Sequence, residues 1–158
     1  MRNLLVCLAA VLLVFGSLAL TADAGPGKGA VKTDLRERTD PGDTYGSGPV
    51  AGWVILNTNA EGMLIVTAKL TDEMPETDFT IWVVVDGTWL AEDLGSMTTN
   101  RNCKGVGHLK LDLADYLPAD YPEDTVPVRV VVDNWYPGSM PLPYVGFATS
   151  EEDVPLKQ

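Results

Sequence analysis

Hydrophobic and polar residues alternate along several short stretches of the chain. In residues 63–70, for example, every second position is aliphatic, and residues 126–132 repeat the pattern. Side chains of a β-strand point alternately to its two faces, so this period predicts strands with one buried face. Gly, Pro, Asn and Asp separate the stretches, and no segment has a helical period. The strands that we expect are 52–58, 63–70, 79–86, 94–99, 106–113, 126–133 and 144–149.

About seven short strands at this spacing are typical of an all-β fold, and we expect an antiparallel, immunoglobulin-like β-sandwich over residues 51–150. Four of the strands present aliphatic or aromatic side chains that could share one core. These residues are Leu64, Val66, Ala68, Leu70, Phe79, Ile81, Val83, Val85, Leu109, Leu111, Leu113, Val126, Val128, Val130 and Val132.

Two quoted segments carry a resemblance to a known class of domain. The run "KLTDEMPETDFTIWVVVDG", followed by "DLGSMTTNRNCKGVGHLKLDL", resembles exported immunoglobulin-like β-sandwich domains, with an lG-x-x-TTN-x-x-G-x-G hairpin. The resemblance covers roughly residues 52–133 and implies the fold alone, without an activity or site residues. The chain departs from the pattern by placing Cys103 and Lys104 where small or polar residues are expected.

The two ends of the chain differ from its middle. Arg2 precedes an apolar run, and the run ends in Ala22-Asp23-Ala24, so residues 1–24 are expected to be a cleaved signal peptide rather than a membrane anchor. We therefore expect a secreted, periplasmic or cell-surface protein. Residues 25–50 are rich in Gly, Pro and charge and predict a flexible leader, with at most a late strand-like piece. Residues 151–158 predict an acidic tail.

The chain carries a net charge of −11. Nucleic acid is an unfavourable partner because phosphate binding needs clustered Lys and Arg, and an anionic membrane surface is disfavoured for the same reason. Another protein or an extracellular glycan remains open as a partner. Excess acid also keeps an exported protein soluble without any ligand.

The stretch "MTTNRNCKGVGHLKL" holds the only histidine, His108, and the only cysteine of the region beyond the signal peptide, Cys103. Its Asn and Gly residues tolerate positive φ and predict a hairpin turn with a free thiol at the tip. A hairpin tip offers no walls to exclude water, so we expect no Cys–His nucleophile pair. No other catalytic motif is present, and we expect a protein that is not an enzyme. An intermolecular disulfide through Cys103 stays open.

Acidic loops raise the possibility of calcium, whereas no other cofactor is expected. Calcium takes six to eight oxygen ligands, which carboxylates from two adjacent loops could supply. The alternative is a solvated acidic rim with no ion. The candidate ligands, if their loops meet, are Asp72, Glu73, Asp120, Glu123 and Asp124.

Tryptophan and tyrosine residues are the other candidates for binding. Trp82 falls on the face of its strand opposite the expected core and, if uncovered, would form an apolar patch typical of a partner or ligand surface. Trp89, Trp135 and Tyr136 lie in turns near strand ends, where aromatic rings can stack on sugars. The alternative is that Trp82 is covered by the leader, a loop or the second sheet, and that the others plug the ends of the fold.

These observations favour a secreted, non-enzymatic interaction or structural module with an unknown partner. The alternative is a carbohydrate- or calcium-binding module that uses the exposed aromatic residues and the acidic loops.

Overall fold

The computed structural model describes residues 29–40, 42–71, 74–134 and 144–156. All of the stretches predicted as strands form strands, and within the described residues the only helical element is one short 3-10 turn, η1. The elements are β1 (Val31–Glu37), β2 (Val50–Thr58), β3 (Met63–Leu70), β4 (Asp78–Val85), β5 (Thr88–Thr98), β6 (Gly105–Asp112), η1 (Leu113–Asp115), β7 (Thr125–Asp133), β8 (Gly146–Ala148) and β9 (Glu152–Pro155).

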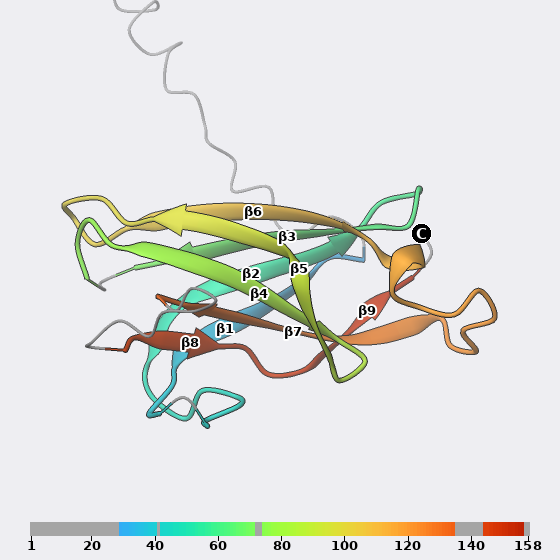
Figure 1. Cartoon of the computed structure of the whole chain (residues 1–158), viewed down its shortest axis with the longest axis horizontal. Coiled ribbons are helices and arrows are strands. Elements are labelled where there is room, and N and C mark those ends of the chain that lie inside the picture. Colours follow the sequence, from blue (N-terminus) through green and yellow to red (C-terminus); the bar gives the residue numbers. More distant parts are fainter. Residues whose placement is uncertain (1–28, 41, 72–73, 135–143, 157–158) are drawn as a thin grey trace, which may run out of the picture.

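The strands form one antiparallel sheet in the order β5-β4-β7-β8-β1-β2-β3-β6. In addition, β9 pairs with residues 125–128 at the start of β7. The sheet curls into a half-barrel, as Figure 1 shows. The all-β, antiparallel part of the prediction is confirmed, whereas the separation into two sheets of an immunoglobulin-like sandwich is not. The short strand β8 explains the difference, because it hydrogen-bonds to both β7 and β1 and joins the two halves.

The predicted core residues line the concave side of the curled sheet. The alternating aliphatic positions 64, 66, 68 and 70 of β3 and 126, 128, 130 and 132 of β7 are fully buried there. Phe147 of β8 packs with Phe79 of β4, their ring centroids 5.9 Å apart. Leu109 is partly buried against the same cluster. Burying one such side chain contributes about 1.5–3 kcal/mol, so the alternation seen in the sequence is what drives the sheet to curl.

Two glycines allow β5 and β6, the strands at the two ends of the sheet order, to approach each other. A Cβ atom on Gly107 of β6 would lie 2.5 Å from Cδ1 of Ile81 and 2.9 Å from both Cβ of Met97 and the carbonyl oxygen of Ser96. A Cβ on Gly95 of β5 would lie 3.2 Å from Cβ of Leu109. Glycine is therefore needed where the backbones of β5 and β6 come close without sharing a ladder of hydrogen bonds.

The two end segments take part in the sheet, which differs from the sequence expectation. β1 falls inside the expected leader, 25–50, and pairs with β2 and β8. β9 falls inside the expected tail, 151–158, and pairs with β7. The hydroxyl of Thr33 in β1 donates to Oε1 of Glu152 at 2.8 Å, which links the two segments. Across the described ranges, no helix is long and apolar enough to span a membrane.

The close approach of β5 and β6 predicts that Gly107→Ala destabilises the protein, because the new methyl group must displace Ile81 and the backbone of β5. We expect a loss of about 1–3 kcal/mol in the free energy of unfolding, measured by urea denaturation. Val106→Ala, one residue away on the exposed face, is the control and is expected to change stability by less than about 0.5 kcal/mol. Equal stabilities for the two variants would contradict this role of Gly107.

Candidate functional site

Trp82 points to the convex face of the sheet, opposite the core, as predicted from its strand. It is nevertheless only 4% exposed, because it forms a second, smaller apolar cluster with Val131 and Ala148. These three residues are cross-strand neighbours on β4, β7 and β8. The exposed apolar patch that an uncovered Trp82 would have made is therefore not present.

A buried carboxylate, that of Asp133 at the end of β7, organises the polar groups around this cluster. Its Oδ1 accepts a hydrogen bond from Nε1 of Trp82 at 2.9 Å, and its Oδ2 lies 3.5 Å from Nη1 of Arg38. Both charged side chains are more than nine-tenths buried. A buried ion pair of this kind holds together only when further hydrogen bonds satisfy its remaining atoms.

Tyr144 provides hydrogen bonds to both members of this ion pair. Its hydroxyl accepts a hydrogen bond from Nη1 of Arg38 at 2.7 Å and lies 3.4 Å from Oδ2 of Asp133, to which it can donate. Burial, together with the neighbouring carboxylate of Asp133, raises the pKa of Tyr144 to about 12. The phenol therefore stays protonated near neutral pH and remains a donor to the carboxylate.

The loop between β1 and β2, residues 38–49, lies over this apolar cluster, and we call it the covering loop. All of its residues except residue 41 are described. Arg38 begins the loop and donates through Nε to the carbonyl oxygen of Asp43 at 2.6 Å. Gly46 has φ +65°, and a Cβ there would lie 2.5 Å from the carbonyl oxygen of Arg36. Glycine is thus required where the loop presses against the end of β1.

The carboxylate of Asp43 fixes the turn of the covering loop. Its Oδ2 accepts hydrogen bonds from the backbone amide of Ser47 at 2.9 Å, from the Ser47 hydroxyl at 2.8 Å and from the amide of Thr39 at 3.1 Å. These hydrogen bonds, led by the Ser47 amide, hold the pKa of Asp43 well below its usual range. Between Asp43 and Ser47 the turn presents Tyr45 to the convex face.

Arg129 lies between two aromatic rings on this face. Its guanidinium carbon is 4.8 Å from the ring centroid of Tyr45 and 5.7 Å from that of Trp89, and its Nη1 donates to the carbonyl oxygen of Thr44 at 3.0 Å. Arg129 is 5% exposed, and its Nε has no hydrogen-bond partner. The guanidinium is therefore held mainly by the two ring faces, a cation–π arrangement that is stronger when desolvated.

The two rings are exposed although the arginine between them is not. Tyr45 is 54% exposed and Trp89 is 46% exposed, and Trp89 meets Trp82 edge-on with ring centroids 6.3 Å apart. We call Tyr45, Arg129 and Trp89 the aromatic–arginine cluster. The two exposed rings supply the contact surface of the cluster, and the guanidinium between them holds their positions.

Of the other aromatic residues predicted for binding, Trp89 is the one that the structure places on an exposed surface. Trp82 supports it from below, and Trp135 and Tyr136 lie outside the described residues. The sequence interpretation missed Tyr45, which lies in the expected leader, and Arg129. A charged residue inside the apolar stretch "VPVRVVVD" was the signal that could have drawn attention to Arg129.

The hairpin between β5 and β6 contains Cys103, as expected, and the thiol is partly exposed. The side chain of Asn100 closes the turn by accepting hydrogen bonds from the amides of Asn102 and Lys104. Cys103 itself takes the positive φ, 57°, that was expected of the Asn and Gly residues. His108 lies on the exposed face of β6, where its Nδ1 is 3.1 Å from the hydroxyl of Thr67 on β3.

The two acidic loops proposed for calcium lie beside opposite ends of β3. The connection that carries Asp72 and Glu73, themselves outside the described residues, starts where β3 pairs with the beginning of β6. The loop at 119–125 follows η1, beside the other end of β3, and Figure 1 shows the two ends well apart. Eight residues of strand span about 25 Å, so the two ends of β3 lie far apart. A calcium site that combines the two loops stays a prediction.

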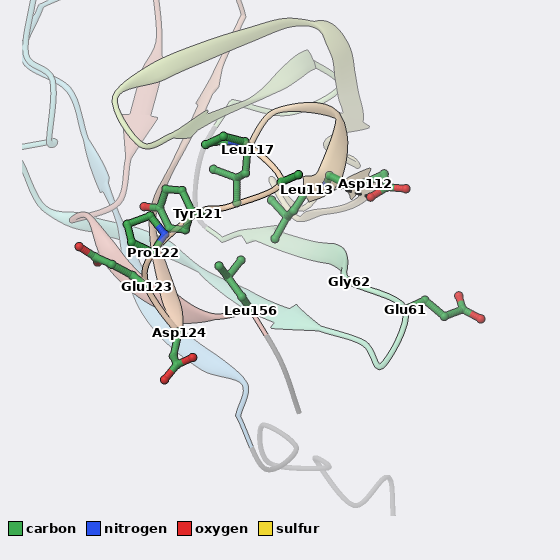
Figure 2. Close-up of a pocket in the computed structure, with 13 residues that line it drawn as sticks. Glu61, Gly62, Asp112, Leu113, Leu117, Tyr121, Pro122, Glu123, Asp124 and Leu156 are labelled. Atoms are coloured by element: carbon green, nitrogen blue, oxygen red, sulfur yellow. Dashed lines mark hydrogen bonds between the residues drawn. The ribbon is translucent and has the colours of Figure 1, made fainter.

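The remaining candidates, Asp120, Glu123 and Asp124, are exposed. Glu123 and Asp124 border a pocket of about 360 Å³ at the η1 end of the half-barrel. Figure 2 shows its leucine and tyrosine side chains grouped in the middle, with the carboxylates of Glu123 and Asp124 pointing away from them. Across the described part of the chain, no three His, Cys, Asp or Glu residues are grouped as a metal site requires.

Comparisons with protein-family models, with curated proteins and with solved structures find no match for this chain. The site is therefore interpreted from its own geometry.

The low pKa of Asp43 predicts an acid-sensitive covering loop. Because the folded pKa lies below the unfolded one, the stabilisation is complete above the unfolded value of about 3.9 and is lost as the pH falls further. We expect the difference in unfolding free energy between wild type and Asp43→Asn to be constant near neutral pH and to shrink below about pH 4. Denaturant titrations from pH 7 to pH 3 measure it, and a difference that does not change with pH would contradict the assignment.

Proposed function

We propose that this protein is a secreted, non-enzymatic interaction module that contacts a partner protein through the aromatic–arginine cluster. The observation that carries the proposal is the pair of exposed rings, Tyr45 and Trp89, fixed on either side of the buried Arg129. Trp, Tyr and Arg are the residues most enriched at the energetic centres of protein interfaces.

The fixed positions of the cluster's side chains support the same proposal. Arg129 is immobilised by the carbonyl oxygen of Thr44, and Trp89 is supported by the edge of Trp82. Side chains that are already ordered lose little conformational entropy on binding, so more of the contact energy appears as affinity. The expectation of export rests on residues 1–24, in which one cation, an apolar run and Ala22-Asp23-Ala24 predict a signal peptide.

The test is site-specific photo-crosslinking in the cell that makes the protein. A benzophenone amino acid at position 45 is expected to give one dominant protein adduct, and Trp89→Ala is expected to reduce its yield at least tenfold. Position 74 is the control, because Met74 is 37% exposed and its carbonyl oxygen accepts a hydrogen bond from the hydroxyl of Thr99, next to the β5–β6 hairpin. The same adducts at positions 45 and 74, or no adduct at position 45, would contradict the proposal.

The carbohydrate alternative has a distinct outcome. If soluble glycans quench the tryptophan fluorescence saturably and Trp89→Leu abolishes the response, then the same cluster binds sugar, and the protein-partner proposal is wrong.

A further inference from the structure

We propose that a second surface, which borders the aromatic–arginine cluster at Tyr45, binds an acidic polysaccharide. The surface is the convex face of the four neighbouring strands β1, β2, β3 and β6. The alternating pattern turns one set of their side chains inward to the core and leaves the other set outside. We call the outer set the lysine face, and its central residues are Lys32, Trp53, Ile55, Ile65, Thr67, Lys69, His108 and Lys110.

The strand register arranges these residues in rows across the sheet. Lys32, Ile55, Thr67 and His108 are successive cross-strand partners on β1, β2, β3 and β6. The neighbouring row is Asp34, Trp53, Lys69 and Val106, so one carboxylate, which pairs with Arg36, borders the indole on the β1 side. Adjacent strands lie about 4.8 Å apart, so each row extends about 14 Å and presents its side chains in fixed order on a rigid sheet.

Trp53 positions two of the cations. The ammonium nitrogen of Lys32 lies 5.0 Å from the ring centroid of Trp53, and that of Lys69 lies 5.5 Å from it. The two ammonium groups are therefore no more than about 11 Å apart. Because the half-buried indole holds both side chains by cation–π attraction, less entropy is lost when an anion binds between them.

The lysines of this face lack carboxylate partners. Within the described residues the ion pairs are Arg36 with Asp34, Arg38 with Asp133 and Arg101 with Glu76, so Lys32, Lys69 and Lys110 are in none of them. The outward positions of the four strands carry four cations, Arg36 included, against two carboxylates, Asp34 and Asp112. The whole chain has 11 Lys and Arg against 22 Asp and Glu, so the lysine face reverses the charge of the rest of the molecule.

A sparse, extended polyanion fits this face. Half-buried Ile55 and Ile65 offer apolar contact to the C–H faces of sugars, and the Thr67 and His108 pair offers hydrogen bonds to hydroxyl groups. A nucleic acid fits less well, since duplex DNA carries one negative charge per about 1.7 Å and would also meet the acidic surface around the face. An acidic polysaccharide has fewer charges per length and many hydroxyl groups between them.

The experiment measures binding of the full-length protein to immobilised polygalacturonate, with neutral dextran as the matched polymer, at low ionic strength where such contacts are strongest. The variant Lys32→Gln with Lys69→Gln removes the two cations on Trp53. The matched control is Arg101→Gln with Lys104→Gln, which removes the same charge from the exposed hairpin. Circular dichroism verifies that both variants are folded.

We expect the wild type to bind polygalacturonate and not dextran. The Lys32 and Lys69 variant is expected to lose at least tenfold in affinity, and the hairpin variant less than twofold. Equal losses in the two variants, no binding by the wild type, or tighter binding to single-stranded DNA or to phosphatidylserine vesicles would each overturn the proposal. Crosslinking at position 45 detects a protein adduct, whereas this experiment detects a polysaccharide and depends on Lys32 and Lys69, so failure of either proposal is distinguishable from failure of both.

Discussion

The carboxylate of Asp133, buried on the convex side of the sheet, is the group on which the outer layer of this protein depends. An uncompensated charge there would cost several kcal/mol, so its presence requires donors from three directions. Trp82 comes from β4, Arg38 from the start of the covering loop and Tyr144 from the segment before β8. The requirement to satisfy one anion therefore ties three distant parts of the chain together, and it holds the covering loop against the sheet.

The position of the covering loop decides what the rest of the convex face can do. Once the loop is docked, Trp82 is buried and Tyr45 lies over Arg129, which in turn contacts Trp89. On the other half of the sheet, in the part of the chain that the structure describes, the outward side chains of β2 and β3 are half-buried and most of those of β6 are exposed, so the lysine face stays accessible. One curled sheet thus presents two surfaces of different chemistry, one aromatic and one cationic, on a protein that is otherwise acidic.

Local alternation allowed seven strands and 14 of the 22 residues of the described core cluster to be predicted, because burial of alternating aliphatic side chains follows from the period of a strand. Long-range pairing could not be predicted in the same way. β1 points Val31, Thr33 and Leu35 toward the core and its charged residues outward. This pattern is too polar to be distinguished from the Gly- and Pro-rich sequence around it. The burial of Trp82 depends on packing against Val131 and Ala148 and on a hydrogen bond to Asp133, about fifty and more positions away, and no local pattern records such partners.

Amide hydrogen exchange of the covering loop in Asp133→Asn tests whether the buried carboxylate holds the loop, because this variant removes the charge while preserving the shape of the side chain. We expect exchange at the amides of Asp43, Ser47 and Gly48 to accelerate at least tenfold, while protection in β2 and β3 stays at the wild-type level. Unchanged protection of the loop would contradict the claim that the buried carboxylate holds it in place.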